Sequence, residues 1–131
     1  MNPRLDMIGI HVRDMAATLA SYRRLGLDIP DGAESEGHVE TTLPGGLRVG
    51  WDTHEVMTSF DPAWQPPDGN ARIALCFLVD SPAEVDELYG ELTGAGHTGH
   101  LEPWDAFWGQ RYAILRDPDG NDVALFAPLA P

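Results

Sequence analysis

One pattern occurs twice in this chain, at a spacing of about half its length. Residues 8–14 are apolar at every second position and end at an aspartate, and residues 15–26 follow with the apolar spacing of a helix. Residues 73–80 and 81–92 repeat the same succession of strand, aspartate and helix. A repeat of half the chain indicates a duplicated module rather than a solenoid of short repeats. We therefore expect two similar halves.

Further signals complete each half. The second helix begins with Ser-Pro-Ala-Glu at residues 81–84, a capping box with proline at the first helical position. Strand-like segments follow at residues 38–43 and 47–52 in the first half, and near His100 and within residues 111–126 in the second. In the last segment, Asp-Pro-Asp-Gly forms the turn of a β-hairpin. Each half therefore reads as β-α-β-β-β.

These halves predict an α+β fold in which two tandem βαβββ modules form a cup-shaped mixed sheet. We place module one at about residues 5–53 and module two at about residues 71–128, within a single domain of residues 1–131. Residues 54–70 contain three prolines and are the predicted connector. Alternation along the strands predicts one apolar face packed on the helices and one mixed face that lines a cavity.

Composition excludes several classes of function. The chain has 21 acidic and 8 basic residues, and a surface of this charge repels nucleic acid. No apolar run reaches membrane-spanning length, and the first residues lack the pattern of a secretion signal. The single cysteine, Cys76, is predicted to be a buried hydrophobe in a cytoplasmic protein. We interpret the acidic excess as a solvated surface, with attraction of a cationic small molecule as the alternative.

The duplicated pattern and the terminal Asp-Pro-Asp-Gly hairpin resemble the vicinal-oxygen-chelate superfamily. This superfamily includes glyoxalases, extradiol dioxygenases, fosfomycin-resistance enzymes and bleomycin-resistance proteins. The resemblance covers nearly the whole chain, and it implies metal ligands inside the cup: His on the first strand of each half and Glu on the last. Counting from the aspartates and the hairpin transfers these positions to Met7, Ala74, Ala124, and Gly50 or Trp51. None of these side chains supplies an imidazole, carboxylate or thiolate donor.

The resemblance therefore implies a protein without a metal, cofactor or catalytic residue, similar to the bleomycin-resistance proteins. Those proteins sequester a drug in grooves formed by a dimer, which implies a homodimer here. One alternative is a metal-dependent enzyme of the glyoxalase, dioxygenase or thiol transferase type, with displaced ligands such as His11, Glu40 and Asp122. Another is a structural or regulatory module whose pocket holds no ligand.

Aromatic side chains form the candidate ligand site. Residues 104–108 bring three large rings into one loop, and Trp-Gly-x-Arg at residues 108–111 is similar to a segment common in bleomycin-resistance-like members. That similarity implies that Trp108 borders the groove and that Arg111 is an ion-pair partner, while tryptophans that only cap the core are the alternative. His11 is interpreted as a polar contact to the ligand. We predict a pocket that sequesters a small aromatic or cationic molecule, lined by Met7, His11, Trp51, Trp104, Phe107, Trp108, Tyr112, Asp122 and Ala124.

Overall fold

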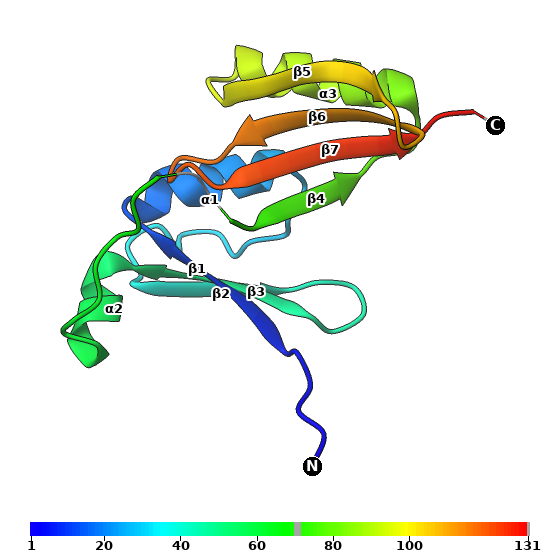
Figure 1. Cartoon of the computed structure of the whole chain (residues 1–131). Helices are drawn as coiled ribbons and strands as arrows, with labels where there is room; N and C mark the ends of the chain where they lie inside the picture. The colour runs from blue at the N-terminus through cyan, green and yellow to red at the C-terminus, as the bar shows by residue number, and fades with distance from the viewer. Residues whose placement is uncertain (70–71, 131) are drawn as a thin grey trace. The chain divides into compact units, whose positions relative to one another are not determined.

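The computed structural model describes residues 1–69 and 72–130, which form two compact units, Met1–Asp68 and Gly69–Pro131 (Figure 1). The first unit contains the segment predicted as module one, and the second contains the segment predicted as module two. Residues 70, 71 and 131, which include the boundary between the predicted connector and module two, lie outside the described residues. None of the helices described is long and apolar enough to cross a membrane.

The first unit is a three-stranded mixed sheet with two helices. Its elements in chain order are β1 (Met7–Val12), α1 (Met15–Arg24), β2 (His38–Thr42), β3 (Arg48–Thr53) and α2 (His54–Phe60). The strand order is β1-β3-β2, in which β1 runs parallel to β3 and β2 runs antiparallel to it. The aspartate at the strand–helix junction, Asp14, caps α1 by accepting a hydrogen bond of 3.1 Å from the backbone N–H of Ala17.

This unit differs from the predicted module in two ways. Residues 54–60 form α2 rather than a connector, because Thr53 caps the helix by accepting from the N–H of Val56 and Glu55 lies in the first turn. In residues 1–68, all of which are described, one strand fewer follows α1 than predicted. The segment in its place carries Pro30, which has no N–H to donate, and Gly32 at a φ of 76°.

The second unit has the predicted βαβββ succession. It consists of β4 (Ala74–Leu78), α3 (Pro82–Gly94), β5 (Thr98–Ala106), β6 (Gln110–Arg116) and β7 (Asp122–Pro128), with strand order β4-β7-β6-β5. The predicted capping box is present: Ser81 accepts from the N–H of Glu84, and the Glu84 carboxylate accepts from the N–H of Asp80. The predicted α+β fold is confirmed.

The hairpin between β6 and β7 turns where the sequence predicts. Asp117 is 5% exposed, and its carboxylate accepts hydrogen bonds from the backbone N–H groups of Asp119 and Asn121. Gly120 has a φ of 85°, which an L side chain adopts only with strain. This Asx-type turn sets the register in which Tyr112 lies opposite Phe126.

In each unit a helix covers one face of the sheet, and the core lies between that helix and the sheet. In the second unit α3 contacts β5, β6 and β7, as Figure 1 shows. In the first unit α1 contacts β3, and Tyr22 of α1 packs on Trp51 with ring centroids 5.4 Å apart. Cys76, however, is exposed rather than buried, because β4 is an edge strand. The fully buried large side chains are Trp51, Tyr22, Leu19, Leu115, Leu125, Val12, Val85, Val123 and Thr18.

Candidate ligand-binding site

The face of the four-stranded sheet that points away from α3 carries Trp104 and Tyr112, two of the aromatic residues predicted for the site. Register places Trp104 of β5, Tyr112 of β6 and Phe126 of β7 in one row across the strands. Arg111, the neighbour of Tyr112, points to the opposite face, where it pairs with Asp86 of α3 at 2.9 Å. We call the face that carries Tyr112 the open face of the second unit.

At one end of this open face, the rings of Trp104, Phe107, Trp108 and Tyr112 form a connected cluster, which we call the aromatic cluster. The centroid of Trp108 lies 5.6 Å from that of Trp104, 5.0 Å from that of Phe107 and 5.2 Å from that of Tyr112. The ring centroids of Trp104 and Phe107 are 6.4 Å apart. The rings meet edge to face, an arrangement that contributes on the order of 1 kcal/mol per pair beyond buried area. Trp108 is therefore the centre of the cluster.

The cluster remains open to solvent although it is strongly apolar. Phe107 is 91% exposed and Trp108 is 48% exposed. Large aromatic surfaces left in water by a folded domain are typical of sites that bind another molecule. The cluster therefore offers ring surface that the fold itself does not use.

Polar contacts hold Trp108 in place. Its indole N–H donates to the side-chain oxygen of Gln110 at 2.8 Å. The turn closes through the N–H of Gly109, which donates to the carbonyl of Ala106, and Gly109 has a φ of 92°. Gln110 was not among the predicted site residues. The sequence signal that could have identified Gln110 is its position two residues after Trp108, at the start of a strand.

The other end of the open face is polar and balanced in charge. Arg116 Nε lies 3.3 Å from Asp122 Oδ1, so the last residue of β6 pairs with the first residue of β7. At the aromatic end, burial raises the pKa of the Tyr112 hydroxyl above its ordinary value, and electrostatic interactions with Cys76 and then Asp122 add to this effect. The Tyr112 hydroxyl therefore stays protonated at neutral pH, so it is available to donate a hydrogen bond.

The other predicted site residues lie outside the aromatic cluster. Ala124 lies on the open face, opposite Ile114, but is fully buried there, and Trp51 is fully buried against Tyr22 on the helix-covered side of β3. Trp51 is therefore a core residue of the first unit. His11 is exposed on β1, with its ring 5.5 Å from that of Trp64. Only Trp104, Phe107, Trp108 and Tyr112 of the predicted set are brought together by ring contacts.

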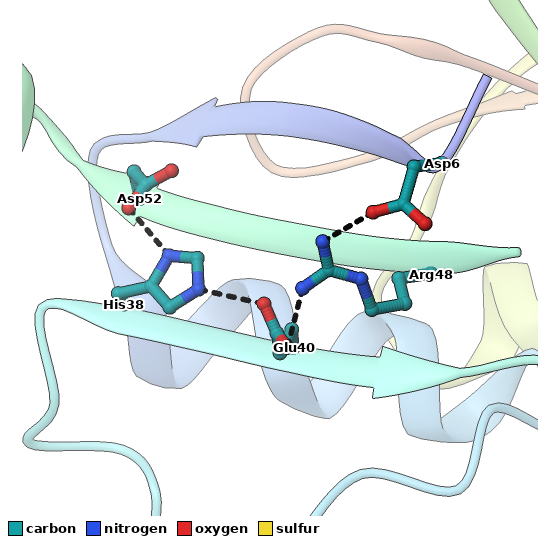
Figure 2. A network of polar contacts seen from close by, with 5 residues as sticks. All are labelled: Asp6, His38, Glu40, Arg48 and Asp52. Carbon is teal, nitrogen blue, oxygen red and sulfur yellow. Dashed lines mark hydrogen bonds and ion pairs between the residues drawn. The ribbon is translucent and has the colours of Figure 1, made fainter. Parts of the chain in front are cut away.

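A second group of polar residues lies in the first unit, on the side of the sheet away from α1. Figure 2 shows the chain of contacts Asp52–His38–Glu40–Arg48–Asp6, which we call the charge network. His38 Nδ1 lies 2.7 Å from Asp52 Oδ1, and His38 Nε2 lies 2.9 Å from Glu40 Oε2. Arg48 donates to Glu40 at 2.8 Å and to Asp6 at 2.5 Å. The network uses both ring nitrogens of His38.

The electrostatics of the network follow from these contacts. Hydrogen bonds with Glu40 and then Asp52 raise the pKa of His38 above its ordinary value, in spite of partial burial. Hydrogen bonds from His38 and then Arg48 lower the pKa of Glu40. Both pKa shifts favour the imidazolium of His38 and the carboxylate of Glu40, and each ring nitrogen of His38 already has a carboxylate partner.

The described residues do not fit the metal that the family resemblance implies. They contain no group of three or more His, Cys, Asp or Glu side chains placed to hold an ion. The displaced ligands considered above are otherwise engaged: Glu40 binds His38 and Arg48, and Asp122 pairs with Arg116. His11 contacts the ring of Trp64. These side chains therefore do not form a metal site.

Comparison with known proteins identifies the family. The profile of the Glyoxalase/Bleomycin resistance protein/Dioxygenase superfamily matches residues 4–125, so the chain belongs to this superfamily. No protein with a curated description matches the chain.

Solved structures agree on the fold. A glyoxalase/bleomycin resistance protein/dioxygenase family enzyme from Burkholderia phytofirmans PsJN is similar with a TM-score of 0.82 and 24% identity, covering 97% of this chain and 100% of that one. A glyoxalase-related enzyme from Fulvimarina pelagi is similar with a TM-score of 0.79 and 17% identity, covering 95% and 87%. A family member from Nocardioides is similar with a TM-score of 0.78 and 20% identity, covering 98% and 85%. At these identities the likeness concerns the fold alone.

Proposed function

We propose that this protein binds and sequesters a small planar aromatic molecule at the aromatic cluster, without a metal or cofactor. The observation that carries the proposal is the exposure of Phe107 and Trp108 within a cluster whose rings hold one another in place. A preorganised stacking surface loses little conformational entropy when a flat ligand binds. In this role Trp108 supplies the main stacking surface, Phe107 extends it, and Tyr112 donates from its protonated hydroxyl.

Charge on the open face favours a neutral ligand over a cation. The charged residues that β6 and β7 contribute to this face are Arg116 and Asp122, and they pair with each other. Acidic residues gather on α3 instead, where a hollow of about 250 Å³ is lined by Glu84, Glu87, Glu91, Val79 and Leu88. Exposed charges further away than about 8 Å are largely screened at physiological ionic strength. The net charge of −13 therefore gives little selection for cations at the cluster.

We include a homodimer and a cytoplasmic location in the proposal. The outer strands of the second unit's sheet are β4 and β5, and edge strands in stable proteins are usually covered or paired. A twofold pairing of copies is the commonest way to cover such surfaces. The exposed single thiol, Cys76, suits a reducing compartment such as the cytosol.

A matched pair of ligands tests the proposal. We expect 1-naphthalenemethanol, which is neutral, to quench tryptophan emission in a saturable way. Its near-isostere 1-naphthylmethylammonium is expected to bind no more tightly. Affinity for the neutral compound should be insensitive to sodium chloride between 50 and 500 mM. Absence of saturable quenching by either compound would refute the proposal, and tighter binding of the cation that weakens with salt would refute the neutral ligand.

A further inference from the structure

The charge network links β2, β3 and the segment before β1 on one side of the first unit's sheet. His38 and Asp52 are Cα partners across β2 and β3, and Glu40 lies two residues after His38 on β2. Arg48 returns the chain of contacts from β2 to β3 and extends it to Asp6, in the segment before β1 (Figure 2). Strand β2 lies at the edge of this sheet, so its attachment depends on β3 alone among the strands.

His38 has a particular protonation requirement in this geometry. Both of its partners, Asp52 and Glu40, are carboxylates, and an ionised carboxylate can only accept hydrogen bonds. Neutral imidazole has a single N–H and one lone pair, so it can donate to one of them only. The observed pair of contacts therefore requires the imidazolium with both N–H groups in use. In the neutral form, one nitrogen lone pair would face a carboxylate oxygen at less than 3 Å.

We propose that His38 is a proton-operated clamp that holds the edge strand β2 to β3. In the protonated state, His38 bridges Asp52 and Glu40, and Glu40 in turn orients Arg48 toward Asp6. Loss of the proton breaks one of the two bridges. Strand β2 then keeps its backbone hydrogen bonds to β3 but loses one of the side-chain contacts of His38.

The groups around His38 support this direction. Asp52 of β3 and Glu40 of β2 contact it directly, while Arg48 and Asp6 act through Glu40. Strand β1 contributes the thioether of Met7, which is neutral, and His11, the Cα partner of Asp52, whose ring contacts Trp64. With His38 protonated, the five network residues carry a formal charge of −1, from three carboxylates and two cations. Without that proton the charge becomes −2, and repulsion among the carboxylates adds to the loss of the bridge.

The pH dependence has a definite sign. Some groups have a higher pKa in the folded state than in the unfolded state. Such a group makes its full contribution to the free energy of unfolding at pH values below its unfolded-state pKa, which for histidine is about 6.5. The contacts raise the pKa of His38, so its contribution is lost as the pH rises through that raised value. The clamp is therefore closed at pH values below the raised pKa of His38 and open above it.

Histidine-selective ¹⁵N NMR on the whole protein tests the protonation state directly. We expect both ring nitrogens of His38 to be protonated at pH 7 and the titration midpoint to lie above 6.5. Glu40→Gln keeps the shape and an acceptor oxygen but removes the charge, so it should lower this midpoint in a folded protein. A single neutral tautomer at pH 7, or an unchanged midpoint in Glu40→Gln, would overturn the proposal.

Thermal unfolding and amide exchange test the mechanical consequence. In the wild type, the unfolding temperature and the exchange protection of β2 amides, corrected for intrinsic rates, should both fall across the His38 titration. His38→Gln should remove this fall, whereas His100→Gln, in the other unit, should retain it. A His38→Gln variant that keeps the full fall would show that His38 is not the clamp.

Discussion

The side chain of Met7 occupies the space that a side chain at Gly50 would need. Its sulfur lies 2.9 Å from the position that a Cβ atom at residue 50 would take, and the ring of His38 lies 3.5 Å from the same point. The family resemblance assigns a metal donor to Met7 and another to Gly50 or its neighbour. In this chain those two positions pack on each other, so a donor at residue 50 would require Met7 to move.

The first prediction concerns metal content. We expect the purified protein to contain no stoichiometric divalent metal, because Met7 and Gly50 supply no donor and the nitrogens of His38 are already bound. Elemental analysis measures this, and calorimetric titration with Zn²⁺, Ni²⁺ and Mn²⁺ provides the check on affinity. One tightly bound ion per chain would restore the metalloenzyme as the better explanation.

The second prediction is a steric one in the first unit. A Cβ atom on Gly37 would lie 2.5 Å from Val56 Cγ2, and the branched Val56 side chain has little rotamer freedom on α2. Gly37→Ala should therefore lower the free energy of unfolding by about 1–3 kcal/mol. In a Val56→Ala background the same change should cost little. Chemical denaturation of the double-mutant cycle would contradict this account if the two effects simply added.

Arg111 gives a prediction that separates structure from binding. It joins β6 to Asp86 of α3 and to Asp105 of β5, as an ion-pair partner rather than a ligand contact. Both carboxylates are more than half exposed, so Arg111→Ala should cost only about 1 kcal/mol or less of stability. Affinity for 1-naphthalenemethanol should not change. A large loss of affinity in a stably folded variant would place Arg111 in the site.

Much of the fold was predictable because its signals are local. The strand–aspartate–helix repeat, the capping box from Ser81 to Glu84 and the Asp-Pro-Asp-Gly turn each involve residues within a few positions of one another. The ion-pair role of Arg111 is also confirmed. Helix α2 was missed because its signal, Thr53 followed by Glu55, is short and precedes three prolines.

The features that were not predicted depend on register between distant segments. His38 meets Asp52 because β2 and β3 align in one particular register, which the spacing of 14 residues does not determine. Trp51 was predicted to line the ligand site because it is one of the aromatic residues near a strand end. In the structure, Trp51 lies opposite Ile10 of β1 and its side chain is buried in the core. Exposure of Cys76 follows from the edge position of β4, which is also a property of the whole sheet.

Oligomeric state is the subject of the fourth prediction. We expect sedimentation equilibrium at micromolar concentration to give the mass of two chains, because a twofold contact covers edge strands and exposed apolar groups such as Leu78. A monomer at this concentration would exclude a binding groove built from two chains. The aromatic cluster, which belongs to one chain, would remain the candidate site.

The most direct test of the proposed function is the affinity of a Trp108 variant. Stacking on one ring contributes on the order of 1 kcal/mol beyond buried area, so Trp108→Ala should weaken binding of 1-naphthalenemethanol about fivefold or more. Phe60→Ala, which removes another exposed ring from the first unit, should leave the dissociation constant unchanged. Calorimetry on the three proteins gives the comparison without relying on tryptophan emission. If Trp108→Ala binds as tightly as the wild type, the aromatic cluster is not the binding site.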